Sequence, residues 1–317
     1  MLFSLKPKET RKELFGRDRE LEELHRLIRT DWVIILGRRM TGKTSLLKTF
    51  LREVNGIYIN LLGVNSIRGF LYELSKHVSR REYSIDLKIF KLSISSLVDD
   101  LFSQLDGRVI GLDEVQDLPS NYFLKLLKRV WDTYDVKIVF TGSMVGVIKC
   151  LLEPKPSNPL YGRKPIVMKL KPFTRDMSRD FLIRGFRECG VEISDLEIEE
   201  VIERLNGFVG WLTYYGNFRC IRGLDHYSAL EQVYGEGKGV MLEELKRFLS
   251  TRRDPRRYIL LLKTLPATWS ELRNRLNVNN KILRDMLRSL ENAFLIEKIG
   301  RTYTIPDPVL KRLILEL

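Results

Sequence analysis

The stretch LGRRMTGKTSLL, residues 36 to 47, decides the fold. Its Gly37-x-x-x-x-Gly42-Lys43-Thr44 spacing is that of a phosphate-binding loop, and it follows a short apolar run, residues 32–36, that is typical of a buried strand. Glycine adopts backbone conformations that other residues resist, so successive N–H groups can point at phosphate oxygens where the next helix begins. A chance glycine-rich turn would lack this strand-before and helix-after context. The sequence therefore predicts nucleotide binding.

Two side chains give the loop its chemistry. Lys43 supplies a mobile positive charge for the β- and γ-phosphates, and the Thr44 hydroxyl is suited to ligate Mg²⁺. The residues expected to contact the nucleotide in this loop are Gly37, Arg38, Arg39, Met40, Thr41, Gly42, Lys43, Thr44 and Ser45.

An acidic pair ends a second apolar strand, VIGLDE, residues 109–114. Hydrolysis needs a carboxylate for Mg²⁺ and a group that orients the attacking water. We expect Asp113 to hold Mg²⁺ through water and Glu114 to polarise the attacking water. An acidic strand end facing solvent is the alternative, but pairing with the glycine-rich loop about seventy residues upstream favours hydrolysis.

Two further residues are candidates for the same chemistry. Ser143 ends the strand pattern VKIVFTGS, and the carboxyl ends of parallel strands line the ligand crevice. Its hydroxyl could sense the γ-phosphate, hold the water, or simply cap the following helix. Arg163, in NPLYGRKP, could reach phosphate in its own chain or in a neighbouring subunit, although basic loop residues are abundant here.

Strand and helix patterns alternate up to about residue 173. Apolar strands are expected at 33–36, 57–62, 108–114, 136–143 and 165–173, with helical patterns between them. Near-continuous apolar strands separated by helices indicate a parallel sheet covered on both faces. We predict an α/β domain over residues 1–173, a helical domain over 174–250 and a third domain over 251–317.

The third domain has the element order of a winged helix-turn-helix. Helices are expected at 257–264, 269–275 and 279–291, followed by two short strands around Gly300 and a last helix. On the third helix, Lys281, Arg284 and Arg288 share one face, while leucines and a methionine fall opposite. Arg301 in the wing could touch a phosphate backbone. Such a module binds double-stranded DNA or another protein, or the basic face is simply solvated.

Composition limits the class of protein. The net charge of +13 favours a polyanionic partner, such as nucleic acid or an anionic membrane surface, or else a basic surface that is only solvated. No apolar run approaches the roughly 18 residues that span a bilayer, and the start lacks the apolar segment of a secretory signal. Three widely spaced cysteines predict neither a disulfide framework nor a zinc site. A soluble, cytoplasmic protein with no membrane contact is expected.

Taken together, the motifs resemble the archaeal branch of the STAND-type, AAA+-related P-loop ATPases. The resemblance covers essentially the whole chain and rests on LFGRDREL (14–21), GRRMTGKTS (37–45), VIGLDEVQ (109–116), IVFTGS (138–143) and PLYGRKPIVMKLKPF (159–173). It implies ATP or ADP with Mg²⁺ as cofactors, a sheet of strand order 5-1-4-3-2, a helical lid over the nucleotide, and a C-terminal winged helix. It also places Phe15, Gly16 and Arg17 against the adenine end of the nucleotide.

One element departs from the family pattern. NGFVGWL, residues 206–212, carries Val209 where such proteins often have a proline, so lid contacts to the nucleotide are not assigned. No sensor arginine of the lid is assigned either. Slow turnover would suit a switch better than a motor.

Three hypotheses for function follow. The first is a Mg-ATP-dependent switch whose nucleotide state fixes the winged helix, with self-association as one route. The second is a DNA-binding regulator, similar to a replication initiator, that holds nucleotide only as a structural ligand. The third is a scaffold whose winged helix binds protein. A GTPase is disfavoured because no N-K-x-D string occurs.

Overall fold

The computed structural model describes the chain except for residues 79–93, 116–117, 119, 143–147, 149–150 and 152–157. Its residues form two compact units. The sheet unit comprises residues 7–37 and 43–170, and the helical unit comprises residues 1–6, 38–42 and 171–317. The predicted second and third domains both fall within the helical unit, so a division between them stays a prediction. No helix among the described residues is long and apolar enough to cross a bilayer.

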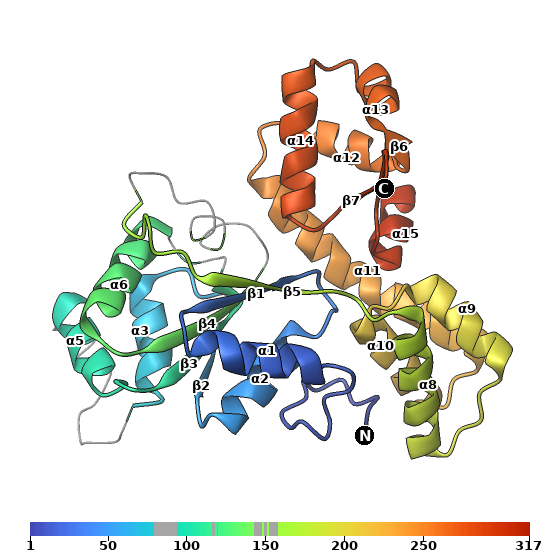
Figure 1. Cartoon of the computed structure of the whole chain (residues 1–317). Helices are drawn as coiled ribbons and strands as arrows, with labels where there is room; N and C mark the ends of the chain where they lie inside the picture. The colour runs from blue at the N-terminus through green and yellow to red at the C-terminus, as the bar shows by residue number, and fades with distance from the viewer. Residues whose placement is uncertain (79–93, 116–117, 119, 143–147, 149–150, 152–157) are drawn as a thin grey trace. The chain divides into compact units, whose positions relative to one another are not determined.

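A five-stranded parallel sheet forms the middle of the sheet unit (Figure 1). Its order is β2-β3-β4-β1-β5, which is the predicted 5-1-4-3-2 order counted from the other edge. The strands are β1 (Val33–Gly37), β2 (Ile57–Asn60), β3 (Val109–Asp113), β4 (Lys137–Gly142) and β5 (Ile166–Leu170). One strand, β4, therefore separates the acidic strand β3 from the loop-bearing strand β1.

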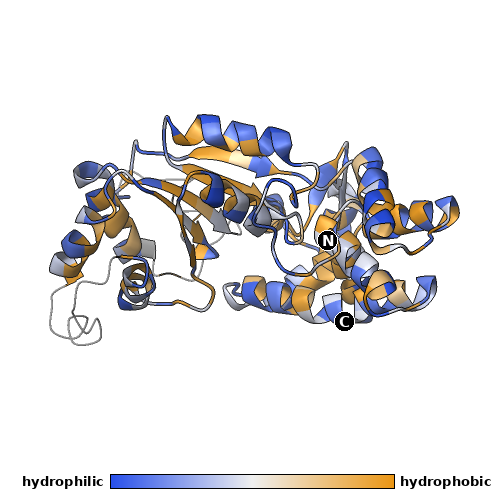
Figure 2. Cartoon of the chain, turned by 90° about the horizontal axis from the view of Figure 1, so that it is seen from below, coloured by the Kyte–Doolittle hydropathy of each residue, from blue (hydrophilic) through white to orange (hydrophobic). Residues whose placement is uncertain are grey.

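Helices cover both faces of this sheet, as right-handed crossovers between parallel strands require (Figure 1). They are α1 (Asp18–Ile28), α2 (Lys43–Glu53), α3 (Ile67–Ser75), α5 (Ile94–Ser103) and α6 (Ser120–Thr133). All five residues of β1 are buried, as predicted for a strand covered on two sides. In Figure 2 the strands are coloured mainly as hydrophobic, whereas the helices alternate between hydrophobic and hydrophilic residues.

A glycine sets the distance between helix α2 and the sheet. A Cβ built on Gly111, in the middle of β3, would lie 2.4 Å from Leu51 Cδ1 and 2.9 Å from Leu47 Cδ1. A larger residue would have to displace these two leucine side chains, which pack α2 against the strand. The small residue in VIGLDE therefore brings the acidic strand end close to the helix that carries the phosphate-loop lysine.

The helical unit consists of helices and one small sheet. Its helices are α8 (Arg175–Cys189), α9 (Asp195–Leu205), α10 (Val209–Cys220), α11 (His226–Ser250), α12 (Pro255–Thr264), α13 (Trp269–Leu276), α14 (Asn280–Asn292) and α15 (Pro308–Glu316). Strands β6 (Ala267–Thr268), β7 (Glu297–Ile299) and β8 (Thr302–Thr304) form an antiparallel sheet of order β6-β8-β7. The expected hairpin around Gly300 is β7–β8, while β6, of two residues, was not predicted.

The start of the chain forms part of the core of the helical unit. The Phe3 ring lies between helices α8 and α10, where a Cβ on Gly185 or Gly216 would come within 2.1 or 2.3 Å of its atoms. Its ring centroid is 5.2 Å from that of Phe186, and Asn217 Nδ2 donates a hydrogen bond to the Phe3 carbonyl. Two glycines thus create the space that one aromatic ring fills.

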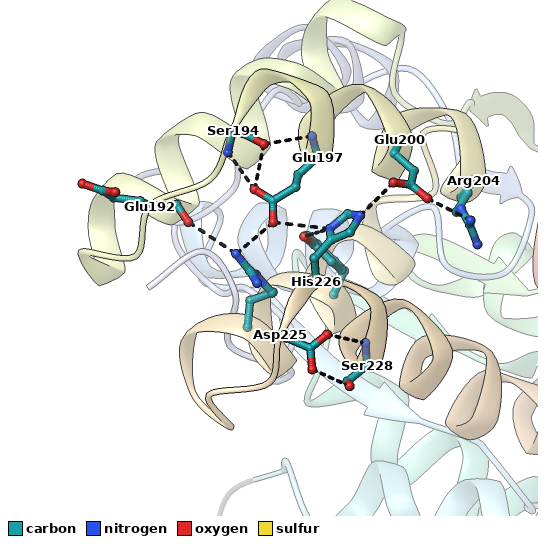
Figure 3. A network of polar contacts seen from close by, with 10 residues as sticks. Glu192, Ser194, Glu197, Glu200, Arg204, Asp225, His226 and Ser228 are labelled. Carbon is teal, nitrogen blue, oxygen red and sulfur yellow. Dashed lines mark hydrogen bonds and ion pairs between the residues drawn. The ribbon is translucent and has the colours of Figure 1, made fainter.

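A polar network joins three helices of the same unit (Figure 3). His226, the first residue of α11, places Nε2 3.0 Å from Glu200 Oε2 on α9 and Nδ1 2.8 Å from Tyr215 Oη on α10. Glu197 on α9 lies 3.7 Å from the same imidazole. The hydrogen bond from His226 lowers the pKa of Glu200. The network therefore joins the start of α11 to the middle of α9 and of α10 through a buried imidazole.

Helices α8 and α10 are also joined covalently, by a disulfide between Cys189 and Cys220 with the Cα atoms 6.0 Å apart. The expectation that the chain has no disulfide was wrong. The two cysteines meet because α8 packs against α10 around Phe3, and this packing cannot be deduced from cysteine spacing.

We expect Cys189→Ser, or reduction of the wild type, to lower the free energy of unfolding by about 3–4 kcal/mol, because the bridge closes a loop of 31 residues in the unfolded chain. Denaturant unfolding with and without reductant measures this. The Cys189→Ser/Cys220→Ser variant should not respond to reductant. Equal stability of the oxidised and reduced wild type would contradict the prediction.

Candidate functional site

The phosphate loop runs from the end of β1 to the start of α2. Met40 and Gly42 have φ angles of 62° and 91°, in the left-handed region. That conformation is costless for Gly42 but strained for Met40, so the surroundings must hold it. Lys43 Nζ donates to the Gly37 carbonyl 2.9 Å away, and closes the turn. Successive backbone N–H groups in such a turn form a concave anion site.

The Asp113 carboxylate is buried in the sheet unit and accepts hydrogen bonds from three side chains. Asp113 ends β3 and is only 2% exposed. Thr44 Oγ1 and Tyr58 Oη each donate to its Oδ2 at 2.9 Å, and Thr141 Oγ1 donates to Oδ1. Burial raises the pKa of the Tyr58 phenol, and the charges of Asp113 and Glu114 raise it further. The phenol therefore remains a neutral donor at ordinary pH.

Thr44 and Asp113, the two predicted Mg²⁺ ligands, are brought together by α2 and β3. Mg²⁺ prefers oxygen ligands, takes one or two groups from the protein, and completes its shell with water and phosphate oxygens. A hydroxyl and a carboxylate 2.9 Å apart beside a phosphate loop fit that set.

Glu114 follows directly after β3, half-buried, with a φ of 58°. A left-handed residue at this point turns the chain sharply. Asp113 and Glu114 therefore do not point to opposite faces of the sheet as consecutive residues of a strand would. Glu114 is the residue after Asp113, so it lies at the same edge of the sheet. This position agrees with a residue that orients water beside the metal site.

The segment predicted to face adenine lies at the start of α1. Gly16 has a φ of 65°, Phe15 is half-buried, and Arg17 is 4% exposed with Nη1 2.7 Å from Glu20 Oε1. Burial lowers the pKa of Arg17, while the ion pair with Glu20 raises it. The contact of these residues with the nucleotide stays a prediction.

The remaining two candidates are placed differently. Ser143 lies outside the described residues, but Thr141, two residues earlier, has the hydroxyl that reaches Asp113. Arg163 precedes β5 at the edge where β1 begins, opposite the edge where the phosphate loop follows Gly37. Its guanidinium pairs with Asp132 at 2.9 Å. The role of Arg163 at phosphate, in its own chain or in a neighbouring subunit, stays a prediction.

Residues 38–42 of the loop belong to the helical unit, where they contact helix α10. The Gly210 N–H donates to the Met40 carbonyl at 2.9 Å. A Cβ on Gly210 would lie 2.5 Å from Met40 Sδ and 3.1 Å from its Cα, so only glycine fits.

Val209 begins α10, where an N–H has no partner within the helix and proline is equally suited. Its replacement of the expected proline leaves the helix start intact.

Two arginines of the loop make ion pairs within the helical unit. Arg38 Nη2 lies 2.6 Å from Glu297 Oε2 on β7, and Arg39 Nη1 lies 3.0 Å from Glu244 Oε2 on α11. Burial raises the pKa of Asp307, the N-cap of α15, and the hydrogen bonds that it accepts, with a smaller contribution from the charge of Arg38, act against this rise. The loop therefore contacts α10, α11 and the small sheet. The sequence did not predict these particular contacts.

The basic residues predicted to contact DNA are exposed on the surface of the C-terminal block. Lys281, Arg284 and Arg288 are exposed on α14, and the opposite face of the helix is buried through Leu283, Met286, Leu287 and Leu290. Arg301 is exposed in the turn between β7 and β8. The amphipathic pattern is as predicted, and its partner stays a prediction.

A parallel sheet of this order, a phosphate loop after its central strand and an acidic end on β3 together define a P-loop ATPase. The chain belongs to the family described as the ATPase domain predominantly from Archaea, whose model matches residues 14–214.

Several known proteins are similar to it. The structure of a Walker-type ATPase of Pyrococcus abyssi is 31% identical, with a TM-score of 0.84 over 99% of each chain. An ORC2 protein of Aeropyrum pernix, solved with ADPNP and ADP, shares the fold at 14% identity, with a TM-score of 0.60 over 98% of this chain and 97% of that one. An uncharacterized protein of Methanocaldococcus jannaschii is 26% identical over 56% of this chain, which spans 40% of that relative.

We expect Glu114→Gln to keep ATP affinity but to lower turnover by at least about 100-fold, because a lost water-orienting base typically costs 10²–10⁴ in rate. Steady-state hydrolysis and binding of a fluorescent ATP analogue measure the two effects. Glu73→Gln, on the surface of α3, is the control. Undiminished turnover in Glu114→Gln would remove this role.

Proposed function

We propose that the protein is a Mg-dependent, ATP-binding and ATP-hydrolysing molecular switch of the STAND/AAA+ type, whose nucleotide state controls a C-terminal winged helix, residues 251–317. The observation that carries the proposal is the set of contacts that residues 38–42 of the phosphate loop make within the helical unit. Met40 contacts α10, Arg39 pairs with α11, and Arg38 pairs with β7. A loop held by these contacts cannot change around a phosphate without affecting those elements.

The nucleotide chemistry is assigned to the sheet unit and the loop. Lys43 and the loop N–H groups hold the phosphates, Phe15, Gly16 and Arg17 face adenine, and Glu114 orients the attacking water. Thr44 and Asp113 would hold Mg²⁺, which neutralises charge on the phosphate oxygens when bound. Ser143, or Thr141 beside it, would contact the γ-phosphate or the water.

The control of the winged helix is assigned to three contacts of the loop. The two ion pairs of Arg38 and Arg39 are partly exposed and weak, on the order of 1 kcal/mol or less each. The contact between Met40 and Gly210 is stiffer, because it combines a backbone hydrogen bond with packing that leaves no space for a Cβ. ATP shifts the switch only as far as it binds the two states differently. Slow turnover would prolong the ATP-bound state.

The ion pairs provide the test of coupling. Hydrogen exchange of residues 251–317 is expected to change when wild type binds ATP, and the change is expected to shrink in Glu244→Gln/Glu297→Gln. These substitutions remove the acidic partners of Arg39 and Arg38 but leave the residues of the loop intact.

The control is Glu231→Gln/Glu236→Gln, which removes two surface ion pairs of α11 that do not involve the loop. It should behave as wild type. If ATP leaves exchange of residues 251–317 unchanged in wild type, the switch is refuted.

A second candidate function is DNA binding through the winged helix, with nucleotide as a structural ligand. The exposed basic face of α14, over a buried apolar face, favours it. The two functions differ in whether affinity for duplex DNA depends on ATP. Absence of DNA binding at low salt would instead favour a protein partner or self-association.

Lys281→Ala/Arg284→Ala/Arg288→Ala is expected to weaken duplex binding and to reduce the slope of log affinity against log salt by roughly 2–3, because each phosphate contact contributes about 0.9. Fluorescence anisotropy at several salt concentrations measures this. The matched control, Arg19→Ala/Arg26→Ala/Arg29→Ala, removes the same charge from exposed residues of α1 and its C-cap. An equal loss in the control would indicate a general charge effect.

A further inference from the structure

Tyr58 connects the strand β2 to the candidate metal site. It lies on the face of the sheet that helix α2 covers, where Lys48 Nζ is 4.7 Å from the ring centroid. From there its hydroxyl reaches Oδ2 of Asp113 at 2.9 Å. The neighbouring residues of β2, Ile57 and Ile59, are buried on the other face. Tyr58 is thus the residue of β2 whose side chain donates a hydrogen bond to the Asp113 carboxylate.

The oxygen that Tyr58 contacts is also the oxygen that Thr44 contacts. A carboxylate oxygen has two acceptor positions, and on Oδ2 of Asp113 the Thr44 and Tyr58 hydroxyls can fill both. Among the described residues Oδ1 accepts a hydrogen bond from Thr141 alone and keeps a second position. The phenol therefore determines the orientation of the carboxylate and leaves Oδ1 as the oxygen that is open to a metal ion or to its water.

We infer that Tyr58 is a positioning residue for divalent metal binding, which holds Asp113 oriented for Mg²⁺ through the hydrogen bond between Tyr58 Oη and Asp113 Oδ2. The inference rests on the proposed Mg-dependent function and assigns that site a residue from a strand outside the two nucleotide motifs. Partners that orient a metal ligand typically affect metal affinity 10- to 100-fold when removed.

Tyr58→Phe tests the inference, because phenylalanine keeps the ring against Lys48 and removes only the hydroxyl. Binding of a fluorescent ATP analogue is measured in EDTA and across a Mg²⁺ titration, and hydrolysis is measured over the same titration. We expect the apparent Mg²⁺ dissociation constant to rise about 10-fold. Affinity in EDTA should be unchanged, and turnover should recover at saturating Mg²⁺.

Tyr134→Phe is the matched control. Its hydroxyl donates to Asp99 at the same distance of 2.9 Å, but it precedes β4 at the edge of the sheet where the strands begin. The Mg²⁺ dependence of this variant should equal that of wild type. Unchanged affinity in EDTA also shows that Tyr58→Phe is folded, since a damaged fold would lower it.

The outcomes separate the inference from the proposed function. If wild type requires Mg²⁺ and Tyr58→Phe has the same Mg²⁺ dependence, Tyr58 has no positioning role while the proposed function stands. If Tyr58→Phe loses affinity equally with and without Mg²⁺, its role is structural and the inference is overturned. Wild type whose nucleotide binding and hydrolysis ignore Mg²⁺ would overturn both.

Discussion

Burying the charge of Asp113 is the constraint on which the sheet unit depends. A buried carboxylate is costly unless hydrogen bonds satisfy it, and here the donors come from three different elements, as Thr44, Tyr58 and Thr141. They can converge only when β2 and β4 flank β3 in the observed register and α2 packs closely over Gly111. The fold that satisfies the carboxylate is also the fold that presents it beside the phosphate loop.

The phosphate loop has a comparable role in the helical unit. Met40 is held in a left-handed conformation, and its carbonyl receives the N–H of Gly210. Strain at a residue of this kind is stable only where neighbours fix it. The turn that carries the predicted phosphate contacts thus also anchors the start of α10 within the helical unit.

The sequence predicted what depends on neighbours along the chain. Apolar periodicity located the strands of the sheet, glycine spacing located the loop, and the acidic pair marked the end of β3. What it missed depends on partners far apart: Tyr58 needs the register of β2 against β3, Arg38 meets a residue 259 positions away, and Cys189 needs the packing of two helices. The role of Arg163 stays a prediction, because no sequence pattern fixes the position of a basic loop residue.

The Phe3 ring, held between α8 and α10, has a consequence for synthesis on the ribosome. Phe3 is made 213 residues before Gly216, and its site is complete only after Gly216 has been made. At a synthesis rate of 5–20 residues per second, roughly 10–40 s pass between the synthesis of Phe3 and that of Gly216. The helical unit therefore needs residues 1–6 to complete its core. A fragment that starts at residue 171 would leave the space between α8 and α10 that Phe3 fills without its aromatic ring.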